Sequence, residues 1–83
     1  ETCYYLRMRV IDRPGVLARI SELLGKQKIS ISDVIQKERR LGSVVPLILL
    51  THGTQAHLLS HAVQAIDRLA VLKTKTQVLR IEE

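Results

Sequence analysis

Few side chains in this sequence have the types and spacing that catalysis requires. Cys3 is the single cysteine, which excludes iron–sulfur ligation, a metal site built from cysteine pairs and an internal disulfide. His57 and His61 have the spacing of two metal ligands on one helix face, but no Glu follows His57 and no third ligand is evident. With Gln64 and Arg68 they continue a polar stripe, which favours a solvated helix face. We therefore expect neither a catalytic residue nor a metal site.

One short stretch, Asp12-Arg13-Pro14-Gly15, suits binding better than catalysis. Pro14 fixes its own φ and Gly15 has no Cβ, so backbone can approach a ligand closely. The N–H groups from about Gly15 to Leu17 would face outward at the positive end of a helix and attract a carboxylate. Asp12 beside them could receive an ammonium, and the two charges together describe a free amino acid. On the residues alone, a plain strand-to-helix turn capped by Asp12 is the favoured reading, because Pro-Gly turns are common.

Hydrophobic periodicity predicts the elements that would hold this corner. Residues 4–11 alternate and read as a strand, and an apolar stripe of helical period follows from Val16 to Leu24. Residues 29–37 alternate again, with Ile29, Ile31 and Ile35 expected on one face. Asp33 interrupts that pattern and marks either a bulge or a polar site.

The second half of the chain repeats the scheme. A charged, glycine-containing turn at 38–43 leads into residues 44–51, which are apolar on both faces of a strand. Pro46 cannot donate a ladder hydrogen bond, so we expect a bulge or an unpaired position there. Thr54 is a plausible N-cap for a helix whose apolar stripe runs over 58–69. Residues 71–81 form the last strand, most clearly over Gln77–Ile81.

The order strand, helix, strand, strand, helix, strand predicts an α+β fold of the ferredoxin-like βαββαβ type. Its four-stranded antiparallel sheet would carry both helices on one face, and residues 1–83 would form a single domain. The other face would leave the doubly apolar strand exposed, so we expect a partner, either a second copy or the rest of a longer chain. The strand patterns at both ends suggest a module cut from a longer protein.

Composition and charge distribution argue against two further classes of partner. The net charge is +5, but the basic residues are scattered, and the third strand carries no aromatic residue on which a base could stack. A nucleic-acid partner is therefore not expected. No apolar run approaches the ~18 residues of a membrane span, so no membrane partner is expected either. One unpaired thiol fits a reducing cytoplasm.

The segments DRPGVLARI and ISISDVIQ resemble the ACT domain, a small regulatory module that senses amino acids, and the resemblance covers essentially all 83 residues. More narrowly, YYLRMRVIDRPGVLA, SDVIQK and VPLILLTH resemble the C-terminal ACT domain of the homoserine dehydrogenase family. The resemblance implies a homodimer paired through the second strand and first helix. It places the effector at the seam, between the corner of one copy and the start of the second strand of the other. The implied effector-binding residues are Asp12, Arg13, Pro14, Gly15, Val16 and Leu17 with Ile29, Ser30, Ile31 and Ser32.

The same resemblance implies a parent enzyme that interconverts aspartate semialdehyde and homoserine. NAD(P) would bind to its catalytic domains, outside this fragment, so no cofactor is expected here. L-threonine would be the natural feedback inhibitor, acting through dimer geometry. Many family members carry Asn at the place of Asp12 and near Ser30, whereas this sequence has no Asn. A structural assembly domain without ligand, the ACT domain of another biosynthetic enzyme and a nucleic-acid binder remain the alternatives.

Overall fold

A computed structural model describes residues 1–81 of the chain, so the last two residues of the predicted 1–83 domain lie outside the described residues. The predicted order of elements is confirmed. The elements are β1 (Cys3–Ile11), α1 (Val16–Lys26), β2 (Ile31–Ile35), β3 (Val44–Thr51), α2 (Ala56–Asp67) and β4 (Gln77–Ile81).

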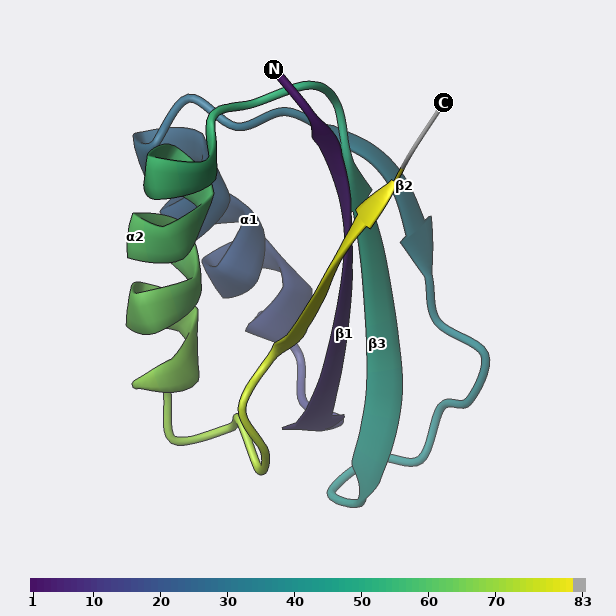
Figure 1. Ribbon diagram of the computed structural model, residues 1–83. Coiled ribbons are helices and arrows are strands. Elements are labelled where there is room, and N and C mark those ends of the chain that lie inside the picture. The colour runs from purple at the N-terminus through teal and green to yellow at the C-terminus, as the bar shows by residue number, and fades with distance from the viewer. Residues whose placement is uncertain (82–83) are drawn as a thin grey trace.

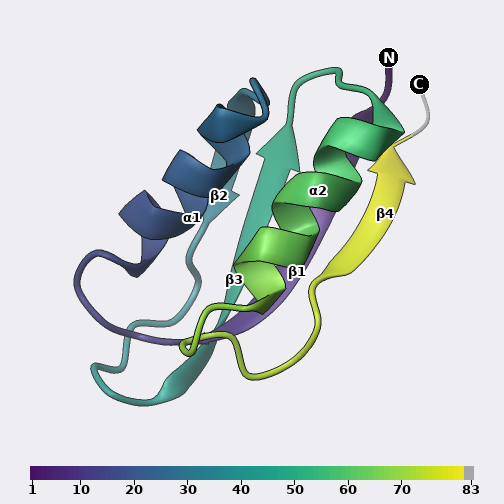
Figure 2. The same cartoon turned by 90° about the vertical axis from the view of Figure 1, so that its left-hand side faces the viewer.

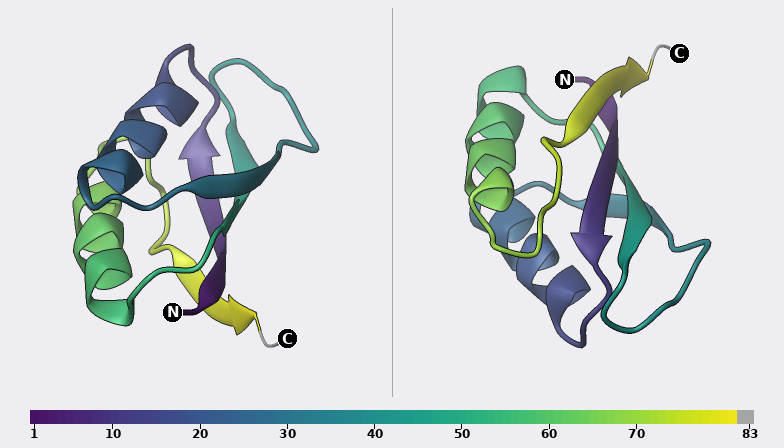
Figure 3. Two further views of the ribbon diagram at one scale, coloured as in Figure 1. Left: turned by 90° about the horizontal axis from the view of Figure 1, so that it is seen from above. Right: turned by 90° about the horizontal axis from the view of Figure 1, so that it is seen from below.

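The four strands form one antiparallel sheet in the order β2-β3-β1-β4, and both helices cover the same face of it (Figure 1). Helix α1 lies toward the β2 edge, and α2 lies in front of β1 (Figure 2). Views along the sheet show the two layers, with the opposite face of the sheet free of helices (Figure 3). The predicted ferredoxin-like α+β sandwich is therefore confirmed, and β2 and β4 are its edge strands.

The core lies between the sheet and the helices, as the two periods of the sequence require. Every second residue of β1 from Tyr4 to Val10 is buried, and so is every second residue of β3 from Val45 to Thr51. Helix α1 adds a stripe that includes Ile20 and Leu24, both fully buried. Alternation sends one set of strand residues to each face, and the helices cover the face that carries this buried set.

Strand β2 is shorter than the predicted 29–37, and its predicted single apolar face is wrong. A register shift against β3 falls between Ile31 and Asp33, which supports the bulge among the two readings given for Asp33. Ile31 pairs with Thr51 on the helix-covered face, whereas beyond the shift Ile35 pairs with Ile48 on the open face. One extra residue in the strand is enough to exchange the faces.

Two further predictions concern β3 and α2. Pro46 lies opposite Arg9 of β1, but β2 ends before reaching it, so the expected unpaired position is confirmed on that side. Thr54 is not the N-cap of α2. The helix begins after Gln55, without a side-chain cap, while Thr54 is buried and exchanges two backbone hydrogen bonds with Thr2. Thr54 therefore pairs with the N-terminal segment and does not cap the helix.

Candidate functional site

The corner between β1 and α1 has a conformation that only its glycine adopts easily. Gly15 is the N-cap of α1 and has a φ of 86°, in the left-handed region. No side chain caps the helix, and no acidic residue lies in its first turn. The Val16 N–H donates to the Arg13 carbonyl at 3.3 Å, and Gly15 accepts the first helical bond from Arg19 at 3.0 Å. The first turn of α1 is therefore positive and uncapped by side chains.

The Asp12 carboxylate turns away from the helix and binds the loop between β2 and β3. Its Oδ2 accepts a hydrogen bond from the Arg40 backbone N–H at 2.6 Å, and the Arg39 Nε lies 3.4 Å from the same oxygen. The Asp12 residue is only 6% exposed. The reading favoured on the residues alone, a turn in which Asp12 caps the helix, is therefore wrong about the cap. A nearly buried carboxylate needs such donors, because desolvating an unpaired charge is costly.

The backbone of Asp12 holds the same loop from a second side. Its N–H donates to the Ser43 carbonyl at 2.8 Å, and its carbonyl accepts from the Gly42 N–H at 2.9 Å. Gly42 has a φ of 82°, which lets the loop turn back toward β3. Asp12 therefore makes four contacts with a segment that lies about thirty residues further along the chain.

A cavity of about 200 Å³ lies between the corner and this loop. Its walls are residues 10–18, residues 36, 38 and 39 after β2, and residues 45–47 of β3. Strand β2 ends at Ile35, whereas the antiparallel strand β3 begins at Val44, beyond the end of β2. The first residues of β3 therefore have no β2 neighbour, and the cavity lies beside them. It is smaller than the roughly 300–1,000 Å³ of sites for drug-sized molecules, so it suits a small metabolite.

Charges of both signs line this cavity. Asp12 and Glu38 are acidic, and Arg13 and Arg39 are basic. A second hollow, of about 270 Å³, lies on the other side of the corner, against residues 69–71. Its charged lining residues are Arg13 and Arg19 alone. The first cavity therefore matches a zwitterion better than the second.

Within one chain, the two halves of the predicted site lie at opposite ends of the sheet. All residues from Asp12 to Leu17 line the cavity, but none of Ile29–Ser32 does. Ile31 pairs with Thr51 at the end of β3, whereas the corner adjoins Val44 at its start. Seven steps along a strand separate these points by about 23 Å.

The residues of the 29–32 segment have their own local partners. Ile29 is buried in the core. The Ser30 carbonyl accepts from the His52 N–H at 2.9 Å, and the Ser32 hydroxyl donates to the Leu50 carbonyl at 3.1 Å. The segment leads into the β2 edge strand and does not contribute to this cavity in the same chain.

Sequence reasoning missed Gln36, Glu38 and Arg39 as cavity residues. It assigned Gln36 to the predicted strand 29–37, and Glu38 and Arg39 to a charged turn between strands. The spacing of Gln36 and Glu38, which in extended backbone point to the same side, is the one local signal that could have suggested a shared surface. Nothing local indicates that Asp12 draws the loop over the corner.

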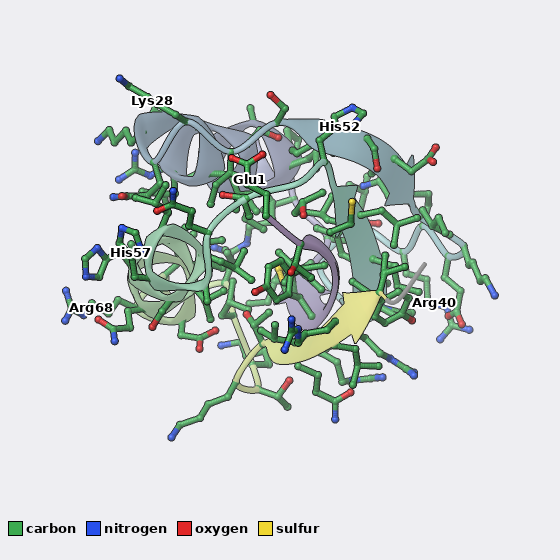
Figure 4. The ribbon with its side chains drawn as sticks, turned by 45° about the horizontal axis from the view of Figure 1, so that its top comes forward. Glu1, Lys28, Arg40, His52, His57 and Arg68 are labelled. Atoms are coloured by element: carbon green, nitrogen blue, oxygen red, sulfur yellow. The ribbon has the colours of Figure 1, made fainter. Side chains whose placement is uncertain are left out.

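The two histidines of α2 lie far from the corner. The ring centroids of His57 and His61 are 6.4 Å apart and the rings are nearly perpendicular. Both residues are exposed, and the side chains of His57 and Arg68 project from α2 away from the sheet (Figure 4). Among residues 1–81, no group of three His, Cys, Asp or Glu side chains is arranged to hold a metal.

This fold, with a glycine corner before the first helix, defines a class of small domain. The model of the ACT domain family matches residues 4–71, and the chain belongs to that family. An ACT domain from GTP pyrophosphokinase of Chlorobium tepidum covers 94% of this chain, which in turn covers 97% of that one, with a TM-score of 0.73. At 13% identity, this likeness shows the fold alone.

The more similar relatives are homoserine dehydrogenases. One from Methylobacillus glycogenes is 42% identical over the whole of this chain, which covers 20% of that protein. One from Mycobacterium leprae is 37% identical over 99% of the chain, again covering 20% of the relative. The crystal structure of a homoserine dehydrogenase from Thiobacillus denitrificans matches 99% of the chain at 40% identity, with a TM-score of 0.88, and the chain covers 18% of it.

This chain thus spans about a fifth of the length of the curated relatives it matches. Across residues 1–81, no helix has both the length and the apolar character needed to cross a membrane.

Proposed function

We propose that this domain senses an amino acid for a homoserine dehydrogenase, with L-threonine as the effector and feedback inhibition as the outcome. The single observation that carries the proposal is the cavity at the corner, which is small, contains both signs of charge and opens beside the uncapped start of α1. A free amino acid has the matching pair of charges. The resemblance of the chain to homoserine dehydrogenases supports threonine, the product of the pathway to which homoserine leads.

The effector would bind between two copies of the domain. Strand β2 is an edge strand with unpaired backbone groups, and its Val34 and Ile35 are exposed. Two copies that pair antiparallel through β2 would bring the start of one strand to the end of the other. That arrangement puts Ile29–Ser32 of the second copy next to the cavity of the first, and α1 lies on the same edge to widen the contact (Figure 2).

This geometry explains how a ligand would regulate the longer protein. A cavity whose walls come from two copies changes the preferred dimer arrangement when it fills, because the ligand has different contacts in each arrangement. The catalytic domains, which would bind NAD(P) and convert aspartate semialdehyde, are proposed to follow that change. The fragment itself is proposed to bind no cofactor, and its single thiol, Cys3, suits the cytoplasm.

Calorimetric titration of the 83-residue chain with L-threonine tests the proposal, with L-serine and L-isoleucine as comparisons. We expect binding at millimolar or lower concentration, with a preference for L-threonine. Sedimentation at the same protein concentration reports whether the chain is a dimer. A folded dimer that binds none of the three amino acids would rule out the sensing function.

A structural assembly domain without ligand is the second candidate, and one observation favours it. The Asp12 carboxylate is satisfied inside the chain, so the corner is stable without an added ammonium. Asp12→Ala combined with Gly15→Ala, made in the longer enzyme, separates the two functions. Threonine inhibition that survives both changes would leave the corner as a turn and the domain as an assembly module.

A further inference from the structure

The nearly buried carboxylate of Asp12, at the corner, is already paired with donors of the same chain. The Asp12 Oδ2 has a backbone donor at 2.6 Å and the Arg39 Nε at 3.4 Å. An ammonium that bound to Asp12 would have to share this oxygen with the guanidinium or displace it. Asp12 is therefore better placed to hold the β2–β3 loop than to receive a ligand.

Glu38 is the other carboxylate on the cavity wall, and its situation is the opposite. It is exposed, and no salt bridge or hydrogen bond to its side chain is found among residues 1–81. It lies one residue before the Arg39–Arg40 pair that Asp12 binds. The position of Glu38 over the cavity is therefore fixed through its neighbours, while its charge stays free.

We infer that Glu38 receives the ammonium group of the amino-acid effector, and that Asp12 is a positioning residue that holds the loop carrying Glu38. The inference rests on the proposed sensing function and assigns the ammonium contact within it. A charge-assisted contact of this kind recognises α-amino acids and discriminates against acids of the same skeleton without the amino group. The carboxylate of the same ligand then faces the start of α1 and Arg13.

The test is a set of titrations of the 83-residue chain and its variants with L-threonine, L-serine and L-isoleucine. The probe without an ammonium is 3-hydroxybutanoate, which is threonine without its amino group. Glu38→Gln should weaken binding of each amino acid that binds by about tenfold or more, the cost of one charge-assisted contact. It should leave the affinity for 3-hydroxybutanoate within about twofold and so narrow the preference for the amino acid.

Lys37→Gln is the matched control, because Lys37 is exposed on the same loop but does not line the cavity. It should leave every affinity unchanged. Asp12→Asn loosens the loop that carries Glu38, so it should weaken binding of the amino acids more than binding of 3-hydroxybutanoate, and the amide hydrogen of Arg40 should exchange faster with solvent. A merely structural role of Glu38 would not change the preference between the two ligand types.

The outcomes distinguish failure of the Glu38 contact from failure of the proposed sensing function. If the unsubstituted chain binds none of the amino acids, the sensing function fails and the ammonium contact fails with it. If the chain binds them but Glu38→Gln has no effect, the sensing function stands and Glu38 is not the contact. A selective loss of amino-acid binding in Asp12→Asn, with Glu38→Gln unaffected, would return the ammonium to Asp12.

Discussion

Replacing Asp12 by Ala should destabilise the domain even in the absence of ligand. The change removes the acceptor of the Arg40 backbone N–H, a bond of 2.6 Å to a carboxylate that is 6% exposed. A hydrogen bond to a charged group contributes about 1.5–3 kcal/mol. The Arg39 pair adds less than about 1 kcal/mol, since the Arg39 side chain is 62% exposed and solvent screens it. We expect the free energy of unfolding to fall by about 2–3 kcal/mol.

Urea unfolding followed by far-ultraviolet circular dichroism measures this loss, at one fixed protein concentration because the domain is proposed to dimerise. Arg40→Ala is the control, because Arg40 gives Asp12 only its backbone N–H and its side chain lies at the rim of the molecule (Figure 4). It should cost less than about 0.5 kcal/mol, as surface substitutions usually do. If Asp12→Ala lowers the free energy of unfolding no more than Arg40→Ala does, the Asp12 carboxylate does not stabilise the loop between β2 and β3.

Three further predictions concern the edge, the corner and the core. Val34→Asp should abolish self-association in sedimentation experiments, whereas Leu79→Asp, an equally drastic change on the opposite edge strand, should not; equal effects would argue against pairing through β2. Gly15→Ala should cost about 1–2 kcal/mol because φ is 86°, whereas Gly25→Ala, inside α1 with free space around it, should stabilise by about 0.5–1 kcal/mol. Thr51→Val should cost about 1–3 kcal/mol by leaving a β1 amide without its 3.0 Å acceptor, and an unchanged urea midpoint would contradict that bond.

The sequence was sufficient for the fold because local signals agreed with the global one. Alternation over β1, the stripe from Val16 and the double apolarity of β3 each predict an element that the sandwich requires. The errors fell where a tertiary contact overrides a local preference. Thr54 pairs with Thr2 instead of capping α2, and the bulge before Asp33 exchanges the faces of β2.

The candidate site was only half predictable. Pro14 and Gly15 predict the corner, because few residue pairs suit such a turn. The loop side of the cavity consists of residues that follow β2. Asp12 holds this loop in place through contacts with Arg39 and Arg40, and hydrophobic periodicity does not predict such contacts. Segments that are distant in sequence and irregular in backbone have no periodic pattern, so only the folded structure identifies Glu38 as a cavity residue.

The most direct measurement is a crystal structure of the 83-residue chain grown with saturating L-threonine. Antiparallel pairing of two β2 strands is expected, with the ligand between Asp12–Leu17 of one copy and Ile29–Ser32 of the other. The ligand ammonium should lie within hydrogen-bond distance of Glu38. A ligand bound away from the corner, or two copies whose β2 edges do not meet, would contradict the account.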